Sequence, residues 1–173
     1  IYLLTAFTAT LAQARVIESN RYADVLEYMN ANTLFVTDLD NTVMQPVQTL
    51  GSDQWGSAQM AEFEKKGFAK EQSTLLGIGM FSLVQHFTKV ETVETDTSSI
   101  IQKIAELGAT QIGLTARHVL LTDRTLKQLN TLGVHFNGKD RFPPNSEFKN
   151  VAHFQDGVVF VGTKNKGETL KAF

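Results

Sequence analysis

Apolar and polar residues follow two distinct patterns along this chain. Two short runs are mostly apolar without alternation, Leu34–Thr37 and Gln111–Leu114, which is typical of strands covered on both faces. Elsewhere apolar residues recur at helical spacing, in stretches that begin at capping residues or end at glycine. The predicted helices cover Ser19–Asn30, Trp55–Gly67, Glu71–Phe87, Thr97–Gly108 and Thr122–Gly133.

The C-terminal part adds shorter elements. A short strand is predicted at Val134–Phe136, and a hairpin at Val151–Gly162. The hairpin turns at Asp156-Gly157, a pair that readily adopts positive φ. A last helix begins within Asn165–Phe173. Strands that alternate with helices predict an α/β fold with a parallel sheet and right-handed crossovers.

Composition limits the possible functions. With 173 residues, of which 42% are hydrophobic, the chain is long enough for one domain with a sizeable core. Its 16 basic and 18 acidic side chains nearly cancel, and neither sign forms a block, so we expect no nucleic-acid partner. The absence of cysteine excludes disulfides, thiolate nucleophiles and cysteine zinc sites, and leaves the redox compartment open.

The N-terminal segment Ile1–Ala14 is uncharged and mostly apolar, and polar sequence begins at Arg15. Its length and its small-residue end are typical of the remains of a secretory signal peptide, which predicts a periplasmic or secreted protein. The alternatives are an N-terminal helix that packs on the core and a cytoplasmic location. The segment is too short to span a bilayer, so we expect no stable membrane insertion.

Two carboxylates, Asp38 and Asp40, directly follow the first predicted strand. In open parallel sheets the functional groups lie at the carboxyl ends of the strands, and Thr115 ends the second strand. Carboxylates two residues apart suit two tasks: the first attacks a phosphorus atom, and the second donates and then removes a proton. The alternative is that both residues form strand-end turns that cap nearby amides.

Phosphoryl transfer needs further groups. Carboxylate and carbonyl oxygens suit Mg²⁺, and the charge on three phosphoryl oxygens calls for a hydroxyl donor and a fixed cation. Thr115 and Lys166 stand in a suitable order along the chain for these tasks, with Lys164 as a competitor of Lys166. The Thr115 hydroxyl could instead bond to backbone. The four histidines lack metal-ligand spacing, and His118 stands out only because it lies near Thr115.

Three motifs resemble a known superfamily. The stretches FVTDLDNT, IGLTAR and NKGETL resemble, in order and spacing, motifs one, two and three of the haloacid dehalogenase (HAD) superfamily of aspartate-nucleophile hydrolases. More narrowly, DLDNTVMQPVQTLGSDQW together with LTAR resembles a bacterial HAD family of unknown function, whose members often carry a signal peptide. The resemblance implies a Rossmann-like parallel sheet with a helical cap inserted after the first strand.

The resemblance also implies a role for each matching residue. Asp38 would be the nucleophile that forms an aspartyl-phosphate, and Asp40 would be the general acid and base. The Asp38 carboxylate and the Asp40 backbone carbonyl would bind Mg²⁺. Thr115 would donate to a phosphoryl oxygen, and Lys166 would offset the charge of the nucleophile and the phosphate.

Further residues would contact the substrate. The resemblance implies that Asn41 and Thr42 shape the turn and offer backbone N–H groups to the phosphoryl oxygens. Arg117 would steer an anionic substrate, with a surface or sheet-edge ion pair as the alternative. Trp55, with Asp53 beside it, would face the substrate or, alternatively, Trp55 would pack in the core of the insertion.

The same resemblance divides the chain into a core, residues 15–42 and 96–173, and a helical cap, residues 43–95. Caps exclude water from the phosphoryl intermediate and select the leaving group. The superfamily's fourth motif, an acidic pair that completes the magnesium site, would lie after Phe173. We therefore expect these 173 residues by themselves to bind Mg²⁺ weakly and to show little phosphatase activity.

Together these inferences predict a Mg²⁺-dependent phosphomonoester hydrolase that acts on a small phosphorylated substrate through an aspartyl-phosphate intermediate. The alternative is a catalytically silent HAD-like domain that binds a ligand or accepts a phosphoryl group, because one scaffold can host many functions. The sequence does not identify the substrate.

Overall fold

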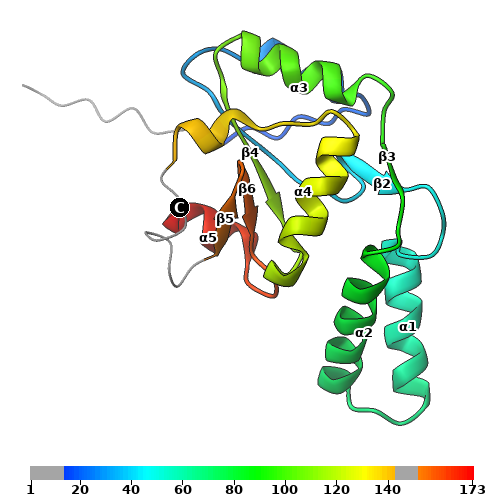
Figure 1. Ribbon diagram of the computed structural model, residues 1–173. Coiled ribbons are helices and arrows are strands. Elements are labelled where there is room, and N and C mark those ends of the chain that lie inside the picture. The colour runs from blue at the N-terminus through cyan, green and yellow to red at the C-terminus, as the bar shows by residue number, and fades with distance from the viewer. Residues whose placement is uncertain (1–13, 143–151) are drawn as a thin grey trace, which may run out of the picture.

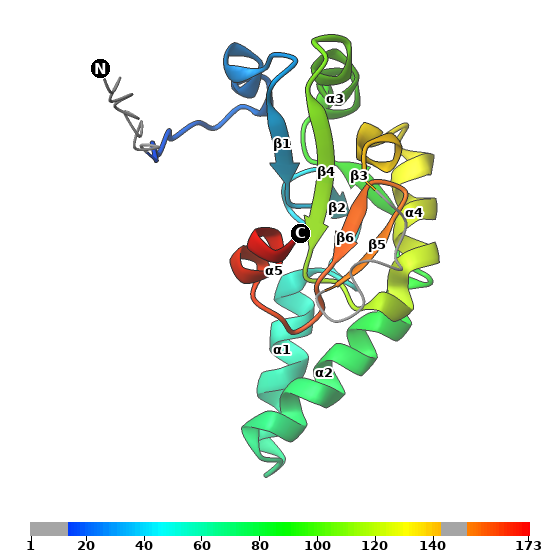
Figure 2. The same cartoon turned by 90° about the vertical axis from the view of Figure 1, so that its left-hand side faces the viewer.

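A computed structural model describes residues 14–142 and 152–173, and the predicted signal peptide lies outside them except for Ala14. The described residues form a mixed α/β fold (Figures 1 and 2). The strands of the main sheet are β1 Leu34–Thr37, β4 Thr110–Thr115, β5 His153–Gln155 and β6 Val158–Phe160. They lie in the order β1-β4-β6-β5.

The sheet is mostly parallel. The two strands predicted as buried, β1 and β4, pair in parallel with Leu34 opposite Thr110. Strand β6 pairs in parallel with β4 and antiparallel with β5. β5 and β6 form the predicted hairpin, and its turn residues Asp156 and Gly157 have φ angles of 48° and 81°. The predicted α/β sheet and its hairpin are therefore confirmed.

Helices lie at all the predicted places, within a few residues. The α-helices are α1 Asp53–Lys65, α2 Lys70–Gln85, α3 Thr97–Glu106, α4 Thr122–Thr131 and α5 Lys166–Ala172. The short 3₁₀ helices are η1 Tyr22–Tyr28, η2 Val119–Leu121 and η3 Asn137–Asp140. The predicted helix within Ser19–Asn30 is therefore a 3₁₀ helix. The sequence patterns did not predict η2 and η3.

Strand β4 lies inside the sheet and is buried from Gln111 to Thr115. Its successive side chains face opposite sides, so the sheet separates two apolar clusters. One contains Leu39, Val43, Met44, Ile101, Leu129, Val134, Phe136, Val158 and Phe160. The other contains Ile112, Leu114, Phe154, Val159 and Val161, with Leu170 of α5 packed against it.

The prediction of a strand at Val134–Phe136 is wrong, because these residues pair with no strand of the described sheet. The next residue, Asn137, occupies the edge of β4 instead: its Oδ1 accepts from the Gln111 N–H at 2.7 Å, and its Nδ2 donates to the Ala109 carbonyl at 2.9 Å. Val134 and Phe136 are each 2% exposed. Their apolar pattern therefore reflects burial and not pairing.

Residues 43–95, the predicted cap, contain more than helices. They include a two-stranded antiparallel ribbon of β2 Met44–Pro46 and β3 Val90–Thr92. Between these strands, α1 and α2 form a helical hairpin that projects from the sheet edge where β1 and β4 end (Figures 1 and 2). Val43 and Met44 pack in the main core, and the division into core and cap remains a prediction.

Candidate functional site

A tight turn after β1 positions both carboxylates of the first motif. The Leu39 carbonyl accepts from the N–H groups of Thr42, Val43 and Met44 at 3.3, 2.9 and 3.0 Å. Asn41 has a φ of 59°, a left-handed conformation that asparagine tolerates better than most residues. Because the Leu39 side chain is fully buried, it anchors the turn to the core. The aspartates on either side of Leu39 lie at the sheet edge.

The turn uses the two N–H groups that were expected to bind phosphate. The Asn41 N–H donates to the Met44 carbonyl at 2.9 Å, and the Thr42 N–H donates to the Leu39 carbonyl. The expected role of these two N–H groups is therefore not supported by the geometry. The Asp40 N–H makes no hydrogen bond within the part of the chain that the structure describes, and this donor is the one left for an anion.

Asp38 and Lys166 lie together although they are far apart in sequence. Lys166 Nζ is 2.6 Å from Asp38 Oδ1, and the side chains are 34% and 46% exposed. Oδ1 also accepts from the Leu39 N–H at 2.8 Å, whereas no hydrogen bond to Oδ2 is present among the described residues. A partly exposed ion pair adds little stability, but it leaves one carboxylate oxygen open beside a cation.

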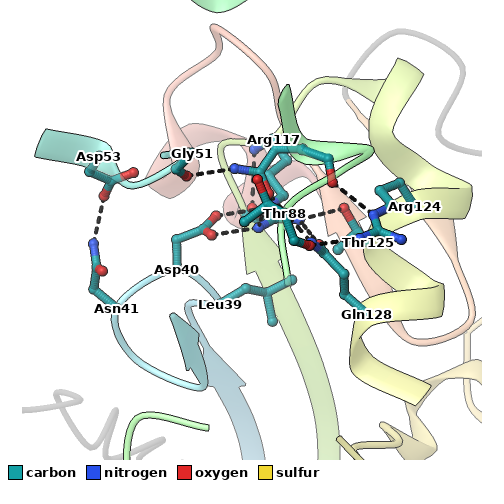
Figure 3. Close-up of polar contacts among 12 residues, drawn as sticks. Leu39, Asp40, Asn41, Gly51, Asp53, Thr88, Arg117, Arg124, Thr125 and Gln128 are labelled. Carbon is teal, nitrogen blue, oxygen red and sulfur yellow. Dashed lines mark hydrogen bonds and ion pairs between the residues drawn. The ribbon is translucent and has the colours of Figure 1, made fainter. Parts of the chain in front are cut away.

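Asp40 forms a bidentate ion pair with Arg117 (Figure 3). Arg117 Nη2 donates to Oδ1 at 2.7 Å and Nε donates to Oδ2 at 2.9 Å. The planar guanidinium matches the two carboxylate oxygens, which makes such pairs strong and directional. Arg117 is only 4% exposed, so the pair fixes Asp40 from the buried side.

The other N–H groups of Arg117 are engaged as well. Nη1 donates to Thr125 Oγ1 at 3.1 Å and to Gln128 Oε1 at 2.6 Å, and Nη2 makes a longer contact of 3.4 Å with Gln85 Oε1. A guanidinium has five N–H donors, and these contacts together with those to Asp40 occupy all of them. Arg117 thus forms an ion pair, as the alternative above had it, but its side chain is buried and not at the surface, and it has no donor left for a substrate.

The same polar network reaches the base of the helical hairpin. Gln85, at the end of α2, donates to the Gly51 carbonyl at 2.7 Å. From α4, Arg124 donates to the Gln85 and Thr88 carbonyls at 2.8 and 2.6 Å, and Gln128 donates to the Thr88 carbonyl at 3.1 Å. Such satisfied buried networks fix one arrangement of the elements they join. Here they join Asp40 to both ends of the hairpin.

Thr115 lies at the expected strand end but is fully buried. Its Oγ1 accepts from the Arg117 N–H at 3.1 Å, so the hydroxyl is bonded to backbone, as one of the two sequence interpretations had it. No hydrogen bond donated by this hydroxyl is present among the described residues, so its proton is uncommitted.

A pocket of about 240 Å³ lies between the sheet edge and the helical hairpin. The core side contributes Asp40, Ala116, Arg117, His118, Leu121, Gly162 and Thr163. The hairpin side contributes Asp53, Gly56, Ser57, Met60, Ile78, Phe81 and Ser82. Trp55 is half-buried and does not line this pocket. The sequence patterns did not predict that Met60, Ile78 and Phe81 line a pocket, because their spacing is that of ordinary apolar helix positions.

Asp53, at the first position of α1, brings a third carboxylate to the site. Asn41 Nδ2 donates to its Oδ2 at 2.6 Å (Figure 3). Partial burial and the nearby negative charge of Asp40 raise the pKa of Asp53, against the opposing effect of the Asn41 hydrogen bond. The residues that line the pocket therefore include two carboxylates, Asp40 and Asp53, and one guanidinium, which is already paired with Asp40.

The geometry offers two oxygens for a hard cation. Asp38 Oδ2 and the Asp40 carbonyl accept no hydrogen bond within the described residues. They fit the preference of Mg²⁺ for one or two carboxylates supplemented by water and substrate phosphate. The described residues contain no group of three or more histidine, aspartate or glutamate side chains that could hold a metal ion.

Residues 18–173 match a family described as "Protein of unknown function (DUF2608)". Two proteins named "Putative outer membrane protein" are similar: one from Chlamydia pneumoniae is 26% identical over the whole chain, and one from Chlamydia trachomatis is 23% identical over 87% of it. The chain spans 66% and 57% of their lengths. No solved structure matches the chain. Among the described residues, no helix has the length and apolar character needed to cross a membrane.

Proposed function

We propose that this chain, which belongs to the DUF2608 family, is a Mg²⁺-dependent phosphomonoester hydrolase that acts through an aspartyl-phosphate on Asp38. The resemblance of its three motifs to the HAD superfamily supports the proposal. The observation that carries it is the contact between Asp38 and Lys166: a half-exposed carboxylate at the end of a parallel strand has one oxygen 2.6 Å from a cation and the other open.

In the first step, Asp38 Oδ1, which lies beside Lys166, attacks the phosphorus atom as the bond between phosphorus and the leaving oxygen breaks, and Oδ2 stays free for the metal ion. Lys166 offsets the repulsion between the carboxylate and the phosphate, because it already contacts Asp38. The free Asp40 N–H is available as a donor to the phosphoryl oxygens. The resemblance assigns the second donor to Thr115, whose hydroxyl proton is uncommitted although the side chain is buried. The leaving oxygen takes a proton from the Asp40 carboxyl group.

In the second step, water attacks the phosphorus atom of the aspartyl-phosphate and Asp40 takes up a proton from that water. Phosphate is released, and the Asp38 carboxylate returns to its initial form. Arg117 occupies one acceptor site on each Asp40 oxygen. A carboxylate oxygen has a second lone pair, so Asp40 can bind the attacking water without losing Arg117.

Mg²⁺, bound by the Asp38 carboxylate and the Asp40 carbonyl, would neutralise phosphoryl charge. The two oxygens that this chain contributes are also the ones that accept no other hydrogen bond, so binding the ion breaks no contact described above.

The test is phosphate release by the full-length protein from an aryl phosphate in the presence of Mg²⁺. We expect Asp38→Asn to remove nearly all activity, because the covalent route is lost, whereas Thr115→Ala should cost on the order of 10²–10³-fold, the usual effect of one lost donor. Asp123→Asn, an exposed carboxylate on α4, is the matched control. Turnover of Asp38→Asn close to that of the unmodified protein would exclude Asp38 as the nucleophile.

A second candidate is a phospho-acceptor domain, in which Asp38 is phosphorylated and hydrolysis is slow. The observation that favours it is the buried bidentate pair of Asp40 and Arg117, since both Asp40 oxygens already accept hydrogen bonds from the guanidinium. Mass spectrometry after incubation with acetyl phosphate separates the two functions. A long-lived adduct on Asp38 without sustained phosphate release would support the acceptor.

We also propose that the protein works outside the cytoplasm. The names of the two chlamydial relatives and the apolar character of Ile1–Ala14 support this location. N-terminal sequencing of the protein after expression with a start codon in a bacterium should find a mature chain that begins near Arg15. Recovery of the uncleaved chain from the cytoplasm would contradict export.

A further inference from the structure

The wall that the helical hairpin contributes to the pocket is apolar. Met60 of α1 and Ile78 and Phe81 of α2 line it, and Leu121 faces the same space from the core. From this wall we propose that the pocket selects phosphomonoesters with an apolar, uncharged leaving group of about one or two rings. The inference rests on the proposed phosphatase function and names the substrate class of that site.

Two glycines allow these side chains to lie where they do. A Cβ on Gly77 of α2 would collide with the Met60 side chain, so the absence of one lets Met60 cross between the two helices. A Cβ on Gly56 would lie 3.4 Å from the Phe81 ring, which places that ring directly against α1. The apolar wall is therefore packed between the helices and does not depend on freely rotating side chains.

The charges around the pocket disfavour a second anionic group on the substrate. Asp40 and Asp53 line the pocket, and the one guanidinium among the lining residues, that of Arg117, has no free donor. Lys166 contacts Asp38 and is not among the lining residues. A leaving group with its own phosphate or carboxylate would meet Asp53 and the Asp40–Arg117 pair, and no lysine or arginine with a free donor.

The wall also disfavours sugar leaving groups. The hairpin side offers only the hydroxyls of Ser57 and Ser82, besides Asp53, as polar partners. A sugar that enters this space would lose water from several hydroxyls, and those against Met60, Ile78 and Phe81 would find no partner. An aromatic or aliphatic group gains from the same contacts. The pocket, at about 240 Å³, is smaller than the roughly 300–1,000 Å³ of drug-sized sites.

The test compares kcat/KM for 1-naphthyl phosphate, glucose 6-phosphate and fructose 1,6-bisphosphate. We expect 1-naphthyl phosphate to exceed glucose 6-phosphate by about 100-fold, which is the factor by which an apolar pocket discriminates against added hydroxyls. The bisphosphate should be the poorest substrate. Phe81→Ala and Met60→Ala should each lower kcat/KM for 1-naphthyl phosphate about tenfold, mainly through KM. Leu83→Ala, an exposed leucine on the same helix, is the control and should change nothing.

The outcomes separate the two proposals. If phosphate is released but glucose 6-phosphate is as good as 1-naphthyl phosphate, the inference is overturned and the phosphatase proposal stands. If no ester is hydrolysed, the phosphatase proposal fails, and calorimetry with 1-naphthylmethylphosphonate and glucose 6-phosphate still decides the ligand class. Tighter binding of the phosphonate, weakened about tenfold by Phe81→Ala, supports the inference, and equal binding rejects it.

Discussion

At the scale of single residues, the pair of Asp40 and Arg117 has the clearest physical consequences. The guanidinium is buried, contacts both oxygens of Asp40, and also binds Thr125 and Gln128. An ammonium group would keep the charge but could not reproduce this planar set of donors. The pair therefore fixes the direction of the Asp40 side chain, and Arg117 is best described as a positioning residue.

We predict that Arg117→Lys lowers the free energy of unfolding by on the order of 2–4 kcal/mol, because it leaves buried acceptors without donors. If Asp40 acts in hydrolysis, phosphate release should fall as well. Urea unfolding and the phosphate-release assay measure the two effects. Arg21→Lys, at an exposed position, is the control. An unchanged unfolding midpoint in Arg117→Lys would contradict the buried network.

At the scale of elements, η1 is joined to the rest of the fold through Tyr22. The Tyr22 hydroxyl donates to Thr37 Oγ1 of β1 at 3.1 Å, and its N–H donates to Glu94 Oε1 at 2.7 Å. Its ring also contacts Phe35 edge to face, with centroids 6.1 Å apart. A short 3₁₀ helix has little stability of its own. The Tyr22 contacts, together with the packing of Val25, Leu26 and Met29 against the cluster of Ile100, Ile104 and Ala109, determine where it lies.

Tyr22 gives the stability a pH dependence with a defined sign. Burial, assisted by the charge of Glu94, raises the pKa of Tyr22 to about 12 against the opposing effect of its hydrogen bond with Thr37. The folded protein then keeps the proton above pH 10, where the unfolded chain loses it, so stability falls as the pH rises from about 10 to about 12. A shift of this size corresponds to roughly 3 kcal/mol at most.

We predict that Tyr22→Phe removes this decrease. At about pH 8 the variant should be less stable by on the order of 1 kcal/mol, because the hydrogen bond to Thr37 is lost, and the difference should shrink or reverse near pH 11. Urea unfolding at both pH values measures it. Tyr28→Phe, at a 45% exposed position on η1, serves as the control. A constant difference between Tyr22→Phe and the unmodified protein would contradict the raised pKa.

At the scale of the whole molecule, the candidate site is assembled from segments that are distant in sequence. Asp40 and Arg117 are 77 residues apart, and the pocket between them and the hairpin needs residues of α1, α2, η2 and the loop after β6. The network through Gln85 and Gly51 connects the hairpin to the same arginine that fixes Asp40. Orientation of the hairpin and orientation of Asp40 are therefore coupled.

The sequence by itself determined where most helices, β1, β4 and the β5–β6 hairpin lie, and the edge of the sheet at which the motifs meet. Runs of apolar residues predicted β1 and β4, glycine and capping residues marked the helix ends, and the turn at Asp156 was readable from its preference for positive φ. These features depend on neighbouring residues only. The expected proximity of Asp38 and Thr115 followed from a topological rule, because parallel strands place their carboxyl ends at one edge, whereas that of Asp38 and Lys166 followed from the resemblance of the motifs.

Only the tertiary structure decided how those groups are used. The apolar segment Val134–Phe136 is not a strand because Asn137 binds the edge of β4, and the Asn41 N–H is unavailable because Met44 accepts its hydrogen bond. Arg117 faces Asp40 because Gln128 and Thr125 accept hydrogen bonds from its Nη1 group. Each outcome is a competition for a hydrogen-bond partner or for buried space, and its competitors become neighbours only when the chain has folded.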